Sequence, residues 1–176
     1  MKKLWTRYGL KRNSDVILKY KVNNKNMKTR IVARALVYDK DRNMILLVRN
    51  KNCDFWYVPG GGWEYEQENI LECAAREVKE ETGLDVKIEK FLYLREYHDS
   101  PEVIFFESFW LALAKDSAIL NEDHVDLDIN GSVEEARWFA KEDLAKLKVY
   151  PDIFKTTFWN NIEDVVADND RFIGVD

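Results

Sequence analysis

The segment from Asn69 to Thr82 constrains the fold most strongly, because its residue spacing is that of a helix with two chemically different sides. An α-helix turns by about 100° per residue, so Leu71, Ala74, Ala75 and Val78 fall on one stripe. This is the spacing of a face that is buried against other elements. The sequence therefore predicts a helix over these residues that packs on a core by its apolar stripe.

A different side of the same helix collects three carboxylates, Glu77, Glu80 and Glu81, within an arc of roughly 100°. Helices rich in Glu and Lys usually present a solvated face, on which charges of opposite sign alternate. Here Arg76, four residues before Glu80, can hold one carboxylate, but the acids remain in excess. Because hard divalent cations take oxygen ligands, the excess favours a bound metal ion. Gly83 is well placed to end the helix, since a left-handed residue there needs no Cβ.

Length and composition indicate a single globular domain. The chain has 176 residues, of which 46% are hydrophobic and 13% aromatic, which suits one domain with a sizeable core. No run approaches the roughly 18 apolar residues of a membrane span, and the basic N-terminus lacks the apolar core of a signal peptide. Cys53 and Cys73 do not make a disulfide framework, so we expect reduced thiols in a cytoplasmic protein without a membrane partner.

The net charge of −5 is unevenly distributed along the chain. Residues 1–30 hold ten Lys or Arg and a single acid, Asp15, so the rest of the chain is strongly acidic. An acidic body argues against the binding of long nucleic acid. The basic arm is able to meet phosphates or the acidic surface of a partner, but a solvated arm is the simpler interpretation.

Several β-rich runs surround the helix. Residues 30–51 predict two strands joined by the polar turn DKDRN, and residues 86–97 and 103–114 predict a hairpin whose second strand is apolar on both faces. The sequence also predicts a short first strand at 15–20, a strand that leads into a glycine loop at 55–64, and a last short strand at 136–140. Two closing helices are predicted at 141–148 and 151–166. Residues 115–132 form a long acidic connection, which is a candidate functional element. Helices between and after the strands predict a mixed β-sheet covered on both faces.

Upstream of the glutamates, the helix belongs to the longer stretch GGWEYEQENILECAAREVKEETGL. Its spacing is Gly62, five residues, Glu68, seven residues, and then Arg-Glu-Val-Lys-Glu-Glu-Thr-Gly-Leu at 76–84. This stretch resembles the Nudix box, and all nine fixed positions are filled over 23 residues, which makes the match far more specific than a lone glycine motif. In typical members a proline stands two residues before the first glycine, whereas Pro59 precedes Gly62 by three, so this loop carries one extra residue.

The resemblance implies an α/β fold of the Nudix type, an α/β/α sandwich with a mixed β-sheet. It implies a single Nudix hydrolase domain over residues 1–176, with a basic N-terminal extension at about 1–25 and a C-terminal helical segment at about 150–176. Several relatives in the family are dimers, so a homodimer is compatible with the resemblance.

Nudix hydrolases cleave a diphosphate that is linked to another moiety, often a nucleoside. The resemblance therefore implies a hydrolase in which water attacks phosphorus in a small nucleoside diphosphate derivative, with Mg²⁺ or Mn²⁺ as cofactor. The substrate is a polyanion, so carboxylates that hold a cation invert a local field that would otherwise repel it. By resemblance, Glu77, Glu80 and Glu81 are the metal ligands.

The resemblance also gives roles to other residues of the box. The implied catalytic residues are Glu80, Arg76 and Glu68. One of the metal-binding glutamates, or a carboxylate from elsewhere, activates the water, while Arg76 orients a glutamate through a charge-assisted contact. Glu68 joins the outer shell or interacts favourably with the helix dipole. Gly61 and Gly62 are the implied substrate-binding residues, because glycine lets the backbone come close to a phosphate or metal.

Residues outside the box provide further candidates. A further carboxylate from elsewhere is common in the family, and the candidates are Glu134, Glu135, Asp126 and Asp128. For each of them alone, a solvated surface acid is the simpler interpretation. Side chains able to stack on a base or ribose are Trp63, Tyr65, Tyr97 and His98, and aromatic residues expected in the core are Trp56, Phe105, Phe109 and Trp110.

Two other functions remain open from the sequence. One is a Nudix domain that binds a nucleotide without cleaving it, although such modules have degenerate boxes and this box is intact. The other is a diphosphate isomerase, which needs additional metal-binding His and Cys residues, whereas this chain has two of each without clustering. The sequence does not fix which nucleoside diphosphate derivative is the substrate.

Overall fold

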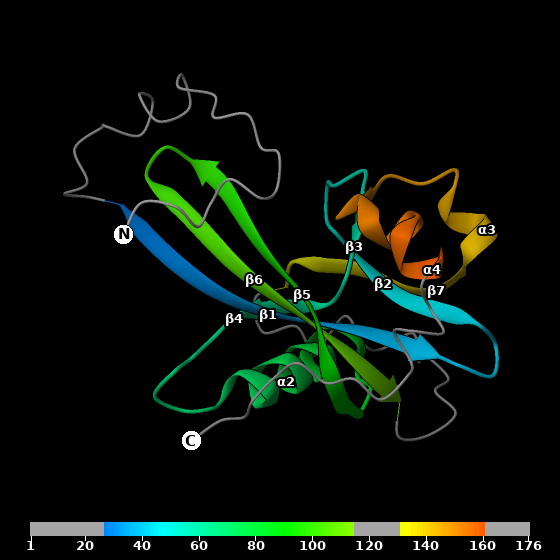
Figure 1. Cartoon of the computed structure of the whole chain (residues 1–176), viewed down its shortest axis with the longest axis horizontal. Coiled ribbons are helices and arrows are strands. Elements are labelled where there is room, and N and C mark those ends of the chain that lie inside the picture. Colours follow the sequence, from blue (N-terminus) through cyan, green and yellow to red (C-terminus); the bar gives the residue numbers. More distant parts are fainter. Residues whose placement is uncertain (1–26, 115–130, 161–176) are drawn as a thin grey trace, which may run out of the picture.

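The computed structural model describes residues 27–114 and 131–160, which form a curled β-sheet with helical elements on both sides (Figure 1). In these residues the sheet has eight strands in the order β5-β6-β1-β2-β3-β8, while β4 pairs with β1 and β7 pairs with β2. The strands are β1 (Lys28–Asp39), β2 (Met44–Asn50), β3 (Trp56–Tyr57), β4 (Gly60–Gly62), β5 (Val86–Ser100), β6 (Val103–Ala114), β7 (Val133–Ala140) and β8 (Val149–Tyr150). The helical elements are α2 (Ile70–Thr82), α3 (Lys141–Leu144), the 3₁₀ helix η2 (Asp152–Lys155) and α4 (Thr157–Asn160).

Strand β6 connects the two kinds of pairing in the sheet. It runs antiparallel to β5 and parallel to β1, and most of its C-terminal half is buried. The predicted hairpin of the two long β-rich runs is therefore confirmed, and its second strand has neighbours on both sides. Strands β1 and β2 are antiparallel, with Tyr38 opposite Ile45, as their polar turn predicts. The sheet is mixed, as expected from the sequence.

Two buried clusters lie on opposite faces of the sheet. Alternate residues of a strand point to opposite faces, so Ala35 and Val37 of β1 join one cluster and Leu36 and Tyr38 join the other. The first cluster also contains Cys73, Ala74, Val78 and Trp110, and the second also contains Leu47, Phe109, Leu144, Phe154 and Phe158. Helix α2 thus covers one face, and the short C-terminal helices cover the other (Figure 1).

Helix α2 has well-defined ends, which confirm the predicted helix. At its start, Asn69 Oδ1 accepts hydrogen bonds from the backbone N–H groups of Leu71 and Glu72, at 2.9 and 3.0 Å. Glu72 Oε2 in turn accepts from the Asn69 N–H at 2.8 Å, which completes a capping box. At its end, Gly83 is left-handed, with φ 71°, and its N–H donates to the Lys79 carbonyl.

Some predicted elements differ in the structure. The glycines at 60–62 form strand β4 instead of a loop, because their backbone pairs antiparallel with β1, with Gly60 opposite Arg34 and Gly62 opposite Val32. Of the closing helices, α3 has four residues, and within residues 151–160 the second one is divided between η2 and α4. The predicted strand at 15–20, the basic extension, residues 115–130 and the chain after residue 160 lie outside the described residues.

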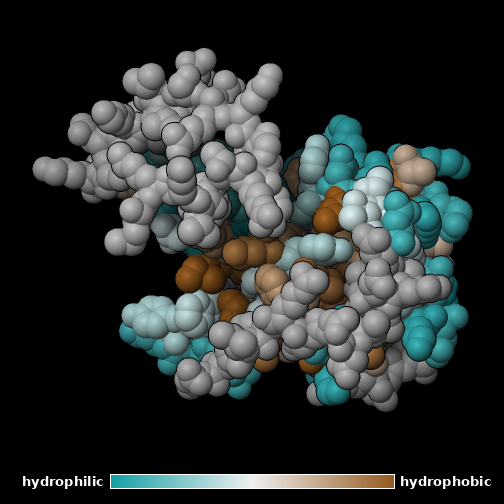
Figure 2. Space-filling model, in the orientation of Figure 1, coloured by the Kyte–Doolittle hydropathy of each residue, from teal (hydrophilic) through white to brown (hydrophobic). Residues whose placement is uncertain are grey.

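The surface of the described part is uneven in polarity. On the face of the molecule shown in Figure 2, hydrophobic residues gather over the region of β1, β5 and β6, and mainly hydrophilic residues surround the C-terminal helices. Exposed large hydrophobic side chains include Ile31 of β1 and Leu94 of β5. None of the helices within residues 27–114 and 131–160 combines the length and the apolarity needed to cross a membrane.

Replacement of Leu47 by alanine tests the packing of the sheet. Leu47 in β2 is fully buried, whereas Leu94 in β5 is 64% exposed. We expect Leu47→Ala to lower the free energy of unfolding by about 2–5 kcal/mol, because it leaves a cavity in a packed core. Leu94→Ala is the matched control, with an expected change of about 0.5 kcal/mol or less. Urea unfolding followed by tryptophan fluorescence measures both, and equal losses for the two variants would contradict the described packing.

Candidate active site

Helix α2 brings its glutamates against the glycine strand β4. Glu81 is buried, and its Oε2 accepts a hydrogen bond of 2.9 Å from the backbone N–H of Gly60. The carboxylate of Glu77 lies against Gly61, where an added Cβ would collide with it. Because β4 is paired with β1 on its other side, the strand offers these carboxylates a fixed backbone.

Gly60 is the position where the site requires glycine. Its φ is +150°, a conformation that side chains rarely adopt, and a Cβ there would lie 2.6 Å from the Cα of Arg34. The absence of a side chain therefore lets β4 approach β1 closely. The same close approach directs the Gly60 N–H to Glu81.

Arg76 gathers the other carboxylates of the site. Its Nε and Nη2 donate to the two oxygens of Glu68 at 2.8 and 2.7 Å, a bidentate arrangement. Its Nη1 donates to Glu77 at 2.8 Å and to Glu80 at 3.0 Å. Its Nη2 also donates to the Gly62 carbonyl at 3.2 Å. Arg76 therefore connects the helix, the segment before it and β4, and the predicted contact with Glu80 is present.

The ionisation of these groups follows from their surroundings. Hydrogen bonds from Arg76 hold the pKa of Glu68 below its usual value, and the same hydrogen bonds raise the pKa of Arg76. Burial raises the pKa of Glu77, although Arg76 acts in the opposite direction. Three carboxylates share one guanidinium, so the helix face stays short of positive charge.

Cys73 lies beside this network, one helical turn before Glu77. Its Sγ is 3.6 Å from the Gly62 carbonyl, and burial raises the pKa of the thiol to about 12. The thiol is therefore protonated at neutral pH and is not a nucleophile. Its contacts are those of a packing residue.

The glutamates face a cavity of about 740 Å³. Its wall is built from Glu77, Glu80, Glu81 and Gly60–Gly62 on one part, from Arg30, Arg34, Arg95 and Glu107 on another, and from the aromatic residues Phe55, Tyr57, Tyr97 and Tyr150. Carboxylates, arginines and rings therefore meet in one concave space, an arrangement typical of a binding site.

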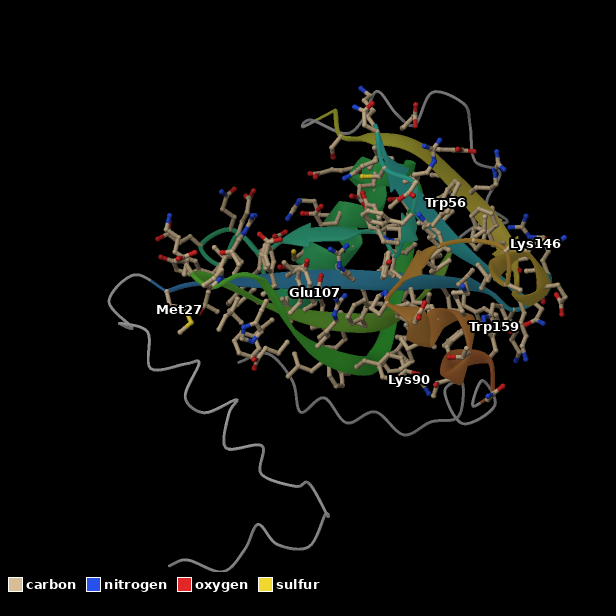
Figure 3. The ribbon with its side chains drawn as sticks, turned by 90° about the horizontal axis from the view of Figure 1, so that it is seen from above. Met27, Trp56, Lys90, Glu107, Lys146 and Trp159 are labelled. Atoms are coloured by element: carbon tan, nitrogen blue, oxygen red, sulfur yellow. The ribbon has the colours of Figure 1, made fainter. Side chains whose placement is uncertain are left out.

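Glu107 is a functional candidate that the sequence reasoning missed. It is buried in β6, where its Oε1 accepts from Arg34 Nε at 2.8 Å and its Oε2 lies 3.1 Å from Arg95 Nη1. Arg34 Nη1 also donates to the carbonyls of Val58 and Gly60. In Figure 3, Glu107 lies in the middle of the ribbon, between Met27 towards one end and Trp159 towards the other. The available signal was a single acid within the apolar run VIFFESFW.

The donor set suits a hard divalent cation, although the carboxylates are engaged elsewhere in this structure. Within residues 27–114 and 131–160, no three acidic, histidine or cysteine side chains are arranged to hold a metal ion. Glu77 and Glu80 contact Arg76, and Glu81 contacts the Gly60 N–H. The ligand type nevertheless fits, because all three groups supply oxygen and line one cavity.

The structure brings most of the predicted site residues together. Glu77, Glu80, Glu81, Gly61 and Gly62 line the cavity, and Arg76 and Glu68 are held next to them. Of the side chains predicted to stack on a base, Tyr97 lines the cavity, whereas Trp63, Tyr65 and His98 are not among its lining residues.

The candidate carboxylates outside the box are placed differently. Glu134 and Glu135 form ion pairs with Arg49 and are not among the residues that line the cavity. Asp126 and Asp128 lie outside the described residues. Of the four aromatic residues predicted for the core, Trp56, Phe109 and Trp110 are buried, whereas Phe105 is half-buried.

Comparison with known proteins identifies relatives of the chain. A family model described as NUDIX domain matches residues 28–159. The chain is 39% identical over 67 residues to the Xenopus laevis protein "Nucleoside diphosphate-linked moiety X motif 6", which covers 37% of this chain and 30% of that protein. It is 28% identical over 142 residues to the NAD-capped RNA hydrolase NudC of Vibrio parahaemolyticus, which covers 79% of this chain and 50% of that protein. The chain thus spans half or less of the length of these relatives.

Solved structures share the same fold. The crystal structure of a UDP-X diphosphatase matches with a TM-score of 0.60 at 18% identity, over 86% of this chain and 71% of that chain. An ADP-ribose pyrophosphatase from Streptococcus suis matches with a TM-score of 0.56 at 22% identity, over 81% of this chain and 96% of that chain. These likenesses confirm the predicted α/β architecture with a mixed sheet.

Substitution of Arg76 by lysine tests its role as the connector of the site. Lysine keeps the charge but loses the bidentate fork to Glu68, so we expect the free energy of unfolding of the metal-free protein to fall by about 1–3 kcal/mol. Arg137→Lys is the control, because Arg137 is 61% exposed and pairs at the surface with Glu135. Its expected loss is about 0.5 kcal/mol or less. Urea unfolding in the presence of a chelator gives both values, and an Arg76 variant as stable as the control would refute the proposed role.

Proposed function

The chain belongs to the Nudix family, and on that premise we propose that it is an Mg²⁺-dependent pyrophosphohydrolase. It cleaves a diphosphate linkage in a nucleoside diphosphate derivative by attack of water on phosphorus. The observation that carries the proposal is the meeting of Glu77, Glu80 and Glu81 with the glycine strand Gly60–Gly62 at one cavity. This arrangement supplies oxygen ligands and closely approachable backbone in the same place.

Glu77, Glu80 and Glu81 would hold the Mg²⁺ or Mn²⁺. When bound, such an ion neutralises phosphate charge and lowers the pKa of a water molecule. The chain's own contribution is positional: Gly60 fixes Glu81, and Arg76 aligns Glu77 and Glu80. Of the two glutamates that Arg76 contacts, Glu80 has the more accessible side chain, at 28% exposure against 13% for Glu77. We therefore assign Glu80 to the orientation and deprotonation of the attacking water.

Glu107 has a different role from that of Glu77, Glu80 and Glu81. It lies between Arg34 and Arg95, which offset its charge, and it holds both guanidiniums at the cavity wall. Arg34 in addition ties this wall to the Gly60 carbonyl. Glu107 is therefore a positioning residue for the arginines that face the anionic substrate, and it is not the general base.

The competing functions find less support. A binding module without catalysis does not explain why the five fixed charged positions of the box, Glu68, Arg76, Glu77, Glu80 and Glu81, lie at the cavity or beside it. An isomerase needs additional His or Cys ligands, and in the described part of the chain neither Cys53 nor His98 lines the cavity. The free thiols Cys53 and Cys73 support a reducing compartment, so we place the enzyme in the cytoplasm.

Metal removal and product analysis test the proposed reaction. Because the single guanidinium of Arg76 offsets only part of the acidic charge on the helix face, we expect hydrolysis of nucleoside diphosphate derivatives to stop when a chelator is present and to return with Mg²⁺ or Mn²⁺. The products should carry monophosphate ends, since water attacks within the diphosphate. Chromatography identifies the products, and a phosphate-release assay measures the rate with and without metal. Full turnover in metal-free buffer, or release of phosphate from simple monoesters alone, would contradict the proposal.

Replacement of Glu81 by glutamine separates a metal ligand from a scaffold residue. Glutamine keeps the size and an oxygen acceptor for the Gly60 N–H, but removes the charge that a hard cation needs. We expect kcat to fall at least ~100-fold, as for the loss of a major electrostatic group. The metal-free melting temperature should be unchanged or slightly higher, because one of three crowded like charges is removed.

Glu89→Gln is the control for this variant, since Glu89 pairs with Lys87 away from the cavity. It should alter neither kcat nor the melting temperature. Wild-type turnover of Glu81→Gln at saturating Mg²⁺ would show that Glu81 is not a metal ligand. A drop in melting temperature together with activity would indicate a structural ion-pair role instead.

A further inference from the structure

Two aromatic rings flanked by two guanidinium groups form a row across three strands at the edge of the cavity. The guanidinium carbon of Arg30 in β1 lies 5.4 Å from the ring centre of Phe105 in β6. The Phe105 and Tyr97 rings are 6.0 Å apart, and the guanidinium carbon of Arg95 lies 4.6 Å from the centre of the Tyr97 ring in β5. Phe105 is directly opposite both Arg30 and Tyr97 in the strand register. We call Arg30, Phe105, Tyr97 and Arg95 the arginine–aromatic ladder.

The ladder offers positive charge and an open ring to the cavity. Arg30, Tyr97 and Arg95 line the cavity, and Tyr97 is 40% exposed. Glu107 offsets only part of the charge, because it is shared between Arg34 and Arg95. Within residues 27–114 and 131–160, no hydrogen bond or ion pair engages the Arg30 guanidinium, whose contact is the Phe105 ring. An oriented guanidinium of this kind suits a phosphate group.

A second aromatic group lies at the other end of the strand order. Phe55, Tyr57 of β3 and Tyr150 of β8 line the same cavity, with ring centres 6.2 Å apart for Phe55 and Tyr57 and 5.3 Å apart for Phe55 and Tyr150. Strands β5 and β8 are the two ends of the sheet, so only its curl brings both aromatic groups to one space (Figure 1).

The centre of the site separates the two groups. The guanidinium carbon of Arg34 lies 5.5 Å from the ring centre of Tyr57, and the same side chain bonds Glu107 and the Gly60 carbonyl. Glu107 then contacts Arg95, which stacks on Tyr97. A ligand that joins the two aromatic groups therefore passes the Arg34–Glu107 pair, at the level of the glycine strand where the diphosphate is cleaved.

We propose that the substrate is a diphosphate with a nucleoside at each end, and that the ladder binds the second nucleoside. This inference rests on the proposed function and specifies its substrate class. One base lies among Phe55, Tyr57 and Tyr150, the other stacks on Tyr97, and Arg30 contacts the phosphate next to it. A sugar in place of the second nucleoside has no aromatic face to stack on the ladder. The cavity of about 740 Å³ is in the upper part of the range of roughly 300–1,000 Å³ for ligand pockets.

Steady-state kinetics on two probes tests the inference. The probes are diadenosine diphosphate and adenosine diphosphate joined to glucose, which differ only in the group beyond the diphosphate. We expect the wild-type protein with Mg²⁺ to favour diadenosine diphosphate at least tenfold in kcat/KM. Tyr97→Leu keeps apolar bulk but removes the ring. Because stacking on one ring is lost, it should raise KM for diadenosine diphosphate about tenfold. It should leave kcat for diadenosine diphosphate, and both kcat and KM for the glucose compound, nearly unchanged.

Two further variants complete the experiment. Tyr65→Leu is the matched control, since Tyr65 is 69% exposed and does not line the cavity. It should change neither kcat nor KM for either probe. Arg30→Gln, at an exposed place near the start of β1, should raise KM for both probes, because both carry the phosphate that Arg30 contacts, whereas Tyr97→Leu affects diadenosine diphosphate alone. Thermal melting of each variant establishes that it is folded.

The outcomes separate this inference from the proposed function. Equal turnover of both probes by the wild-type protein, or equal losses on both probes in the Tyr97 variant, would overturn the ladder as a nucleoside subsite and leave the hydrolase proposal intact. Absence of Mg²⁺-dependent cleavage of either probe, or of any other nucleoside diphosphate derivative, would overturn the hydrolase proposal and this inference with it.

Discussion

The contact between helix α2 and the glycine strand β4 is the constraint on which the rest of the site depends. Arg76 stabilises this contact, because its guanidinium donates hydrogen bonds to Glu68, to the Gly62 carbonyl, and to Glu77 and Glu80 of the helix. Glu81 adds a second connection through the Gly60 N–H. Since β4 is itself paired with β1, the carboxylates are fixed relative to the whole sheet and not only to their own helix.

The curl of the sheet is the second requirement. It places side chains of β5 and β6 and side chains of β3 and β8 around one cavity, although these strands are at opposite ends of the strand order. The buried Glu107, with Arg34 and Arg95, occupies the middle of this arrangement (Figure 3). A buried charge of this kind persists only with partners, so the three side chains have to be retained together.

The two walls of the cavity have complementary charge. The α2 wall is acidic and suits a cation, whereas the wall with Arg30, Arg34 and Arg95 is basic and suits phosphate. The hydrolysis that we propose requires both walls, because carboxylates alone repel a diphosphate and arginines alone do not supply an activated water. The Nudix fold that the chain shares with its relatives thus provides the frame, and we propose that the basic and aromatic wall selects the substrate.

The sequence by itself determined the helix, its C-terminal glycine, the hairpin and the acidic face, because these follow from spacing within a few residues. It also predicted that Glu77, Glu80 and Glu81 share one arc of the helix, and all three line the cavity. Only the tertiary structure decided that Gly60–Gly62 is a strand, that Glu107 faces the cavity, and that Glu134 and Glu135 pair with Arg49 instead. The physical reason is that these features depend on strand pairing and on the curl of the sheet, which join residues far apart in the chain and leave no periodic signal in it.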